Sequence, residues 1–309
     1  MSIFTEWPTE RYPTSLPPLS IAPQYDKSTA LALSWAMQLA YETGNRAKLE
    51  RIVRQWDWDF LDIYAARVGS ILPMTSAKGF IAGPRDLAIL AFSGTDPMMI
   101  DDWIIDFTVH RNADGVHEGF HGAVQSIWKP IAKILGRDGE AGTRRILITG
   151  HSLGGALAVL AAHRLIKEGV VEPERLLGVY TYGMPRVGDA EFAANYAATG
   201  DLERRTYRFI HGEDIVPQVP PMEEPFNFRH VGRSLQVAHG GLFQNSQFDA
   251  IGATPFSLTG IFGALRTTPL AQRPKFPGDP LVSFAIAALP PAIRDHLPDG
   301  YLRACGATL

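Results

Sequence analysis

The chain lacks several sequence features that are typical of particular classes of protein. Among its 309 residues only Cys305 is a cysteine, which excludes an internal disulfide and gives no sign of an oxidising compartment. The net charge is only −3, from 29 basic and 32 acidic residues, which argues against nucleic acid or an anionic membrane surface as a partner. With 46% hydrophobic and 20% charged residues, the composition is that of an ordinary soluble globular protein.

Targeting segments, membrane spans and metal motifs are also lacking. Residues 1–10 have neither the basic nor the apolar region of a secretory signal, so we expect a cytoplasmic protein, with export by another route or from a longer precursor left open. The longest weakly polar stretches, 250–265 and 281–293, are too short for a transmembrane helix and contain glycine or proline. No spacing of His, Cys or carboxylate residues is typical of a metal site, so neither a metal nor an organic cofactor is expected.

What the sequence does contain is a motif in a supporting context. Gly150, Ser152 and Gly154 form G-x-S-x-G, the pattern of a nucleophile elbow, where a serine lies on a sharp turn between a strand and a helix. Residues 146–148 are continuously apolar, and residues 153–167 are rich in alanine and leucine. We expect glycine at both positions because side chains would collide where the strand folds back on the helix. A structural glycine-rich turn is the alternative, and the context favours the nucleophile.

Apolar strands alternate with helical patterns along most of the chain. Strands are expected at residues 60–66, 79–82, 87–92, 146–148, 176–182 and 205–211, and helices at 28–43, 46–56, 117–135, 153–167 and from 190. This alternation is typical of a parallel sheet covered by helices on both faces. We therefore expect one α/β domain over residues 28–309. The proline-rich residues 1–27 are expected to form an arm that lies extended on the domain or is partly disordered.

Open parallel sheets bind ligands beyond the carboxyl ends of their strands, so the partners of Ser152 are sought there. In parallel-sheet enzymes that carry a nucleophile elbow, the catalytic residues follow the chain order serine, acid, histidine. Asp214 follows the strand expected at 205–211 and is the favoured acid. Glu213 and Asp189 compete with it, and a role for Asp214 as an ordinary turn or capping residue is the simpler alternative.

The base must be a histidine beyond the acid, which leaves three candidates. His230 lies in an expected strand, where a packed or edge histidine is the favoured interpretation. His239 precedes two glycines in an irregular region, and His296 lies in a terminal loop that can fold back over the sheet. Chain order alone does not choose among the three.

Seven blocks of sequence resemble, in the same order, the class 3 (fungal-type) lipases of the α/β-hydrolase superfamily. They are residues 91–95, 116–120, 149–156, 182–188, 213–217, 229–232 and 295–302. The resemblance covers roughly residues 30–303 and leaves out the N-terminal arm. It implies an α/β-hydrolase fold, with a central, mostly parallel β-sheet flanked by helices and a short lid after the third strand.

The resemblance also assigns roles at matching positions. It implies that Ser152 is the nucleophile, Asp214 the acid and His296 the base. The backbone N–H groups of Thr95 and Leu153 would form the oxyanion hole, with the Thr95 hydroxyl as an optional further donor. Each fixed donor to the oxyanion is worth about 3 kcal/mol of the barrier.

Three regions are less settled. Residues 97–107 mix apolar and acidic side chains, and the pattern fits either a cover over a cleft or a helix packed on the core; the resemblance implies the lid, in transient contact with a lipid interface. Ser93 stands where many members have arginine, and Asp189 where asparagine is common. The apolar segment 239–291 is either an extra cap, an acyl-chain wall or ordinary core.

The sequence as a whole predicts a serine hydrolase that cleaves carboxylic esters of lipids, a triacylglycerol lipase or esterase, through an acyl-enzyme. Phospholipase A1 or a short-chain carboxylesterase would use the same chemistry on another substrate. A lipase-fold binding protein without catalysis is the alternative of another class, and the retention of Ser152, Asp214 and His296 in their expected blocks opposes it. The expected partner is a lipid or ester substrate, and the oligomeric state is not predicted.

Overall fold

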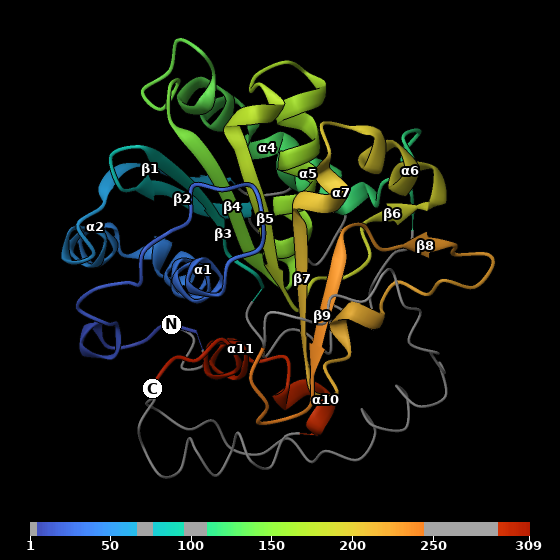
Figure 1. Ribbon diagram of the computed structural model, residues 1–309. Coiled ribbons are helices and arrows are strands. Elements are labelled where there is room, and N and C mark those ends of the chain that lie inside the picture. Colours follow the sequence, from blue (N-terminus) through green and yellow to red (C-terminus); the bar gives the residue numbers. More distant parts are fainter. Residues whose placement is uncertain (1–4, 67–76, 96–109, 244–289) are drawn as a thin grey trace.

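A computed structural model of the chain describes residues 5–66, 77–95, 110–243 and 290–309 (Figure 1). The lid expected at residues 97–107 lies outside the described residues. Most of the segment 239–291 also lies outside them, so its alternative roles stay predictions. None of the described helices is both long enough and apolar enough to cross a bilayer.

Seven strands form one sheet in the order β1–β2–β3–β4–β5–β7–β9. They are β1 (Asp59–Ala66), β2 (Ala77–Gly83), β3 (Leu87–Phe92), β4 (Arg145–His151), β5 (Leu176–Tyr182), β7 (Thr206–His211) and β9 (Arg233–Val237). The first three are antiparallel, and β3, β4, β5, β7 and β9 run parallel. The predicted central, mostly parallel sheet is therefore confirmed. A separate antiparallel pair joins β6 (Gly188–Asp189) to β8 (Phe228–Arg229).

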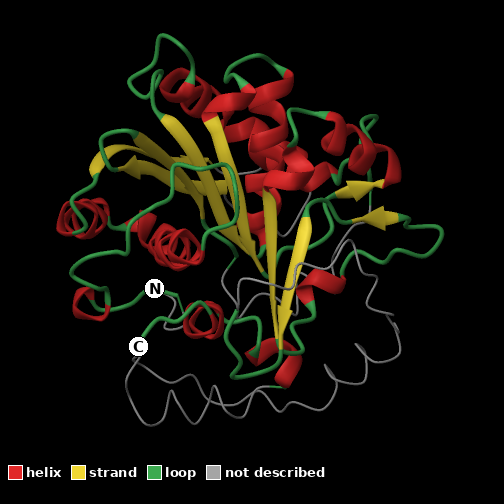
Figure 2. Ribbon diagram, in the orientation of Figure 1, coloured by secondary structure: helices red, strands yellow, loops and turns green. Residues whose placement is uncertain are grey.

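Helices cover both faces of the sheet (Figure 2). One face carries α4 (Glu118–Leu135), α5 (Leu153–Lys167), α6 (Ala190–Ala198) and α7 (Leu202–Arg205). The other carries α1 (Lys27–Leu39), α2 (Arg46–Gln55) and α11 (Pro298–Ala304). The short α10 (Pro291–Arg294) lies just before α11 in the chain. Because both faces are covered, the parallel strands are buried, as their continuous apolar sequences predict.

The central strand β4 shows how the sheet divides the core in two. Ile146 and Ile148 belong to the hydrophobic cluster beneath α4 and α5, while Leu147 belongs to the cluster beneath α1 and α2. Successive side chains of a strand point to opposite faces, so an apolar run with no polar residue is needed where both faces are covered. The run therefore anchors the residues that follow it, His151 and Ser152, to a rigid element.

Side-chain caps fix where several helices begin. The Asp26 carboxylate accepts a hydrogen bond from the Thr29 N–H at 2.7 Å, and the Asn45 side chain accepts one from the Lys48 N–H at 3.1 Å. The first helix was expected to run to Gly44, but α1 ends at Leu39 and a 3₁₀ turn (Ala40–Gly44) follows. Asn45 therefore begins the next helix, and an end of the regular helix at Leu39 had no signal in the sequence.

The described part of the N-terminal arm lies on the domain. Trp7 and Tyr12 are 2% and 3% exposed, and their rings pack around Trp35 of α1. The buried Glu42 carboxylate accepts from the Trp7 backbone N–H at 2.7 Å and from the Tyr12 hydroxyl at 3.0 Å, and it pairs with the Lys48 ammonium at 2.6 Å. Aromatic burial and a paired charge thus hold the arm against α1 and α2.

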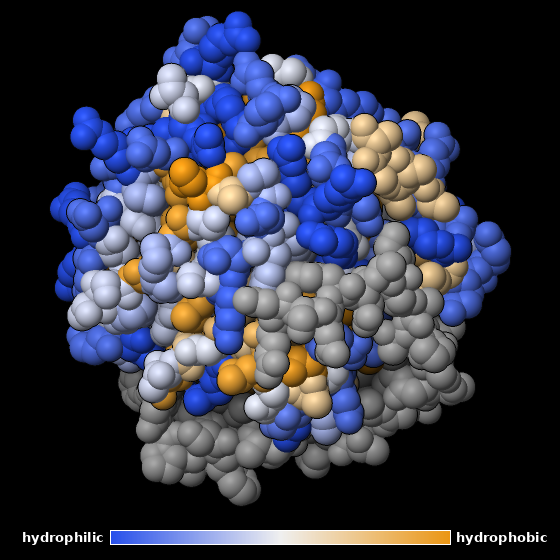
Figure 3. Space-filling view, in the orientation of Figure 1, coloured by the Kyte–Doolittle hydropathy of each residue, from blue (hydrophilic) through white to orange (hydrophobic). Residues whose placement is uncertain are grey.

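The surface is mixed in character. Figure 3 shows hydrophilic side chains over most of one face, with hydrophobic residues coming to the surface in small separate groups. The large hydrophobic side chains most exposed in the described part of the chain are Ile21 and Leu242. Isolated exposed apolar residues of this kind are normal for a globular protein.

Candidate active site

Ser152 lies at the turn between β4 and α5, at the carboxyl edge of the sheet. Its backbone has φ 57° and ψ −129°, a region that residues with a side chain rarely adopt, and such a conformation costs on the order of 1–3 kcal/mol. The Ser152 N–H donates to the Tyr182 carbonyl at 2.9 Å, which ties the strained residue to the end of β5. The strand–turn–helix geometry of a nucleophile elbow is therefore present.

The two motif glycines permit this turn by lacking a side chain. A Cβ atom on Gly150 would lie 2.1 Å from the Gly154 carbonyl oxygen, and one on Gly154 would lie 2.5 Å from the Phe92 carbonyl oxygen. Both contacts are with backbone, which has no room to move. The collision between strand and helix expected from the sequence is thus present at Gly150, while at Gly154 the obstacle is the end of β3.

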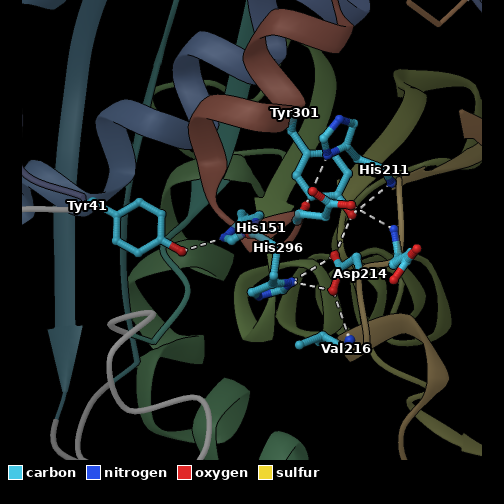
Figure 4. A network of polar contacts seen from close by, with 9 residues as sticks. Tyr41, His151, His211, Asp214, Val216, His296 and Tyr301 are labelled. Carbon is cyan, nitrogen blue, oxygen red and sulfur yellow. Dashed lines mark hydrogen bonds and ion pairs between the residues drawn. The ribbon is translucent and has the colours of Figure 1, made fainter. Parts of the chain in front are cut away.

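Asp214 and His296 meet beside the elbow, although 82 positions separate them in the chain (Figure 4). Asp214 lies in the loop after β7, and His296 lies between α10 and α11. The His296 Nδ1 atom is 2.8 Å from each oxygen of the Asp214 carboxylate, and both side chains are buried. An Nδ1–H that donates to the carboxylate leaves Nε2 as the basic nitrogen.

The Nε2 atom of His296 is buried and has no hydrogen-bond partner in the described part of the chain. A buried polar atom without a partner is costly and asks for an explanation. A general base would have a ring nitrogen without a partner before it takes the proton of a serine hydroxyl in the presence of substrate.

Gly183 allows this pair to approach the sheet. It follows β5 with φ 60°, and a Cβ atom here would lie 2.7 Å from the Asp214 carboxylate and 3.0 Å from the His296 ring. The preceding Tyr182 accepts the Ser152 N–H, so the serine and the Asp214–His296 pair are held against the same turn of chain.

Asp214 accepts two further hydrogen bonds that the sequence did not reveal. The Val216 N–H donates to one oxygen at 2.9 Å, and the Tyr301 hydroxyl donates to the other. Burial and the neighbouring Asp214 carboxylate raise the pKa of Tyr301 well above its usual value, so the phenol stays protonated as a donor. These donors hold the carboxylate in position and satisfy its lone pairs.

The competing acids have other roles. The Glu213 side chain is exposed, and its backbone N–H donates to Asp295 at 2.9 Å. Asp189 caps α6 by accepting from the Phe192 N–H at 3.0 Å and pairs with Arg111 at 3.5 Å. Capping is thus the role of Asp189, at the position where the family commonly has asparagine, a residue that caps equally well.

The competing histidines are also placed by the structure. His230 Nε2 is 2.7 Å from the Pro217 carbonyl oxygen, and burial, with nearby Arg208 and Arg186, lowers the pKa of His230 well below 6.5. His239 Nδ1 is 2.6 Å from the Asp295 carboxylate. Among the three histidines, His296 is the one that the described structure pairs with Asp214.

His151, the second residue of the motif, contacts His296. Its Nε2 is 2.8 Å from the His296 carbonyl oxygen, which can only accept, so Nε2 carries the proton and Nδ1 accepts from the Tyr41 hydroxyl at 2.6 Å. Burial, and then the neighbouring His296, lower the pKa of His151 well below 6.5, which keeps the ring neutral. This link could not be predicted from the sequence, because its residues are distant in the chain: Tyr41, His151 and His296.

The residues expected to stabilise an oxyanion lie around the same turn. Leu153 is the first residue of α5, so its N–H has no partner within the helix. Thr95 is partly exposed, and it follows Gly94, where a Cβ atom would lie 2.7 Å from the His151 carbonyl oxygen and 3.0 Å from the Ser152 Cβ. The backbone before Thr95 is therefore packed against the elbow.

Ser93 occupies the position where many class 3 lipases have arginine. It is buried, its N–H donates to the Lys78 carbonyl at 3.0 Å, and its hydroxyl lies 3.3 Å from the Gly94 carbonyl oxygen. Backbone pairing to β2 thus holds the start of this loop, without a charged side chain.

Comparison with known proteins agrees with this geometry. Residues 89–224 match the family Lipase (class 3). Triacylglycerol lipase OBL1 from Arabidopsis thaliana is 30% identical over 251 residues, which cover 65% of this chain and 47% of that protein. Secreted mono- and diacylglycerol lipase 1 from Fusarium solani is 34% identical over 185 residues, with 57% and 52% covered. The chain thus spans about half the length of these relatives.

A solved structure matches over a larger share. Lipase II from Rhizopus niveus is 26% identical, with a TM-score of 0.53, and the match covers 72% of this chain and 83% of that one. The matched sequence begins in β3 and extends past the elbow and Asp214. The order of the strands, the elbow and the matched sequence agree: over residues 89–224 the chain matches the class 3 lipase family, and its fold is that of the α/β-hydrolases.

Proposed function

We propose that this chain hydrolyses carboxylic esters of lipids through a Ser-His-Asp acyl-enzyme mechanism. The observation that carries the proposal is the state of His296. Its Nδ1 is held by Asp214, its buried Nε2 has no partner in the described chain, and its backbone is bound to the residue before Ser152. A general base in a triad needs this combination of fixed orientation and one available nitrogen.

Each residue then has a chemical task. His296 Nε2 removes the proton from the Ser152 hydroxyl as the oxygen attacks the ester carbonyl. Asp214 keeps the ring in its Nδ1–H tautomer and stabilises the imidazolium that forms. His296 then returns the proton to the departing alcohol, and water, deprotonated in the same way, releases the acid from Ser152.

The negative charge of the tetrahedral intermediate would be bound by backbone donors. The Leu153 N–H is one, because it starts α5 directly after the nucleophile. We assign the second to the Thr95 N–H, which follows the Gly94 backbone packed on the elbow. The α5 macrodipole has its positive end at this point and adds to the same stabilisation.

For the substrate, acylglycerols are the proposal that the relatives favour. The names of the Arabidopsis and Fusarium proteins describe hydrolysis of triacylglycerols and of mono- and diacylglycerols. Phospholipase A1 or short-chain esterase activity would use the same triad. These alternatives differ in the acyl and head groups, so an assay over substrates distinguishes them.

The test is a comparison of the protein with its Ser152→Ala variant on nitrophenyl esters of increasing acyl length, on emulsified triacylglycerol and on phospholipid. We expect the variant to lose activity on every ester that the protein cleaves. Ser126→Ala, which alters an exposed serine on α4, is the matched control and should keep full activity. Equal hydrolysis by the protein and Ser152→Ala would refute the proposal, and no hydrolysis by either would favour a lipase-fold binding protein.

A further inference from the structure

Three ligand-type side chains meet next to the proposed triad without belonging to it. They are His211, His239 and Asp295, and one potential metal-binding atom from each lies within 4.8 Å of the others. His211 and Asp295 are buried, while His239 is exposed. No metal site is expected from the sequence, because these residues are far apart in the chain.

The parallel sheet brings two of them together. His211 is the last residue of β7 and lies opposite Val237, the last residue of β9. His239 follows two positions later, so both histidines emerge at the carboxyl edge of adjacent strands. Asp295 comes from the end of α10, immediately before His296. Three separate segments therefore converge at this point, and Figure 4 shows His211 in the network that also contains Asp214.

One nitrogen of the His211 ring is held by a backbone carbonyl group. Its Nδ1 is 3.2 Å from the Asp295 backbone carbonyl oxygen. A carbonyl can only accept, so Nδ1 carries the proton and the lone pair is on Nε2. Histidines that bind metals usually donate their other N–H to a carbonyl or carboxylate in this way, which fixes the tautomer before the metal arrives.

The Asp295 carboxylate is also held from behind. One oxygen accepts the Glu213 N–H at 2.9 Å, and the other faces His239 Nδ1 at 2.6 Å. Among the described residues, Arg294 also lies near the Asp295 carboxylate. Its Nε atom is 3.5 Å from the oxygen that faces His239, and this Nε makes no hydrogen bond in the described structure. That side chain is 28% exposed, so it has room to turn toward water.

We propose that His211, His239 and Asp295 bind a zinc ion. Two imidazoles and one carboxylate, with water in the fourth position, form a set that Zn²⁺ commonly takes. Ligands about 2 Å from a zinc ion lie less than about 4 Å apart, so the cluster must contract slightly. His239 can supply this movement, because its side chain is 58% exposed on a turn. The coordinating nitrogen of His239 must carry no hydrogen, so the hydrogen between Nδ1 and Asp295 moves to Nε2 of the same ring or to water when the metal binds.

The consequence would be structural. The metal would join the ends of β7 and β9 to the segment that follows α10. It touches neither the substrate nor Ser152 in this scheme. The inference does not depend on ester hydrolysis, and its test does not use that activity.

The experiment titrates ZnCl₂ into the full chain after dialysis against EDTA, by calorimetry, with thermal unfolding in parallel. We expect one zinc ion per chain and a higher unfolding midpoint with zinc. In His239→Gln, the amide still donates to Asp295 but is a poor ligand. Its zinc affinity should fall by at least about 100-fold, since loss of even an outer-shell partner costs roughly 10–100-fold.

The controls separate this site from adventitious binding. His121→Ala removes an exposed histidine of α4 and should leave both the affinity and the zinc-dependent midpoint unchanged. MgCl₂ should give no stabilisation, because Mg²⁺ prefers oxygen ligands. A protein that binds no zinc, or that binds it equally tightly as His239→Gln, would overturn the proposal. Because His239 is exposed, the variant is expected to fold, and its unfolding midpoint in EDTA verifies this.

Discussion

Two aspartate–histidine pairs lie next to each other in this molecule, and only one has the features of a catalytic pair. In Asp214–His296 both partners are buried and the second ring nitrogen is left without a partner in the described chain. In Asp295–His239 the carboxylate is equally buried, but the histidine side chain is 58% exposed. The same two residue types at similar separations, 2.8 and 2.6 Å, therefore make different sites.

The difference is one of surroundings. Asp214 receives hydrogen bonds from Val216, Tyr301 and His296, so its pair is fixed inside a water-poor site. In such a site an electrostatic interaction is stronger than in water. The His239 ring borders solvent, which supplies hydrogen bonds. Burial of the histidine, and not the presence of an aspartate, distinguishes the proposed base His296 from the proposed metal ligand His239.

Replacing the two histidines one at a time gives the largest expected difference in activity. His296→Ala should lower kcat for ester hydrolysis by roughly 10⁶-fold, as loss of the base does in Ser-His-Asp enzymes. His239→Gln should retain most of the activity, because its ring contacts Asp295 and not Asp214. Initial rates on a nitrophenyl ester measure both. Comparable losses in the two variants would break the distinction between the pairs.

The acids provide the next test. Asp214→Asn should lower kcat by roughly 10⁴-fold, because an amide that donates to His296 Nδ1 favours the wrong tautomer. Glu213→Gln changes the neighbouring, exposed carboxylate and should have little effect. If Glu213→Gln were the more damaging change, the acid would have been misassigned.

A smaller effect is expected at Tyr301. Tyr301→Phe removes one charge-assisted hydrogen bond to Asp214, and a loss near 1.4 kcal/mol in the transition state corresponds to about a tenfold lower kcat. KM should stay unchanged, since the hydroxyl contacts the acid and not the substrate. Tyr196→Phe, which removes the buried bond to Thr206, is the matched control: it should lower the unfolding midpoint without lowering kcat.

The smallest effect concerns histidines that are buried without being catalytic. Burial lowers the pKa of His151 and of His230 well below 6.5. The unfolded chain therefore takes up protons below pH 6.5 that the folded chain does not, so stability falls as the pH drops below that value. His230→Gln keeps a donor for the Pro217 carbonyl and removes one titrating ring. Its unfolding midpoint should fall less than that of the unaltered protein between about pH 7.5 and about pH 5.

The sequence predicted the regular elements and the elbow because these are local. Leu87–Phe92 and Leu176–Tyr182 are continuously apolar, and the structure forms strands with those bounds. The collision of a side chain at Gly150 with the Gly154 backbone likewise involves only the motif itself, whereas that at Gly154 involves Phe92 of β3. Local patterns of this kind carry their own physical reason.

What the sequence could not settle depends on contacts between distant segments. Among three histidines the residues alone made no choice, and only the fold places His296 against Asp214. The link from Tyr41 through His151 to His296 needs the 3₁₀ turn after α1, the end of β4 and the segment between α10 and α11 to be packed together. The zinc-type cluster similarly requires β7 and β9 to be neighbours. Pairing across the sheet is a tertiary property, and no periodicity in the sequence encodes it.

Covalent labelling tests whether His296 activates Ser152. The protein is incubated with a nitrophenyl alkylphosphonate, which reacts with activated serines, and the modified peptide is found by mass spectrometry. We predict one phosphonyl group per chain, on Ser152, with a matching loss of esterase activity. His239→Gln should be labelled at the same rate, and His296→Ala should not be labelled. Labelling of another residue, or equally fast labelling of His296→Ala, would contradict the account.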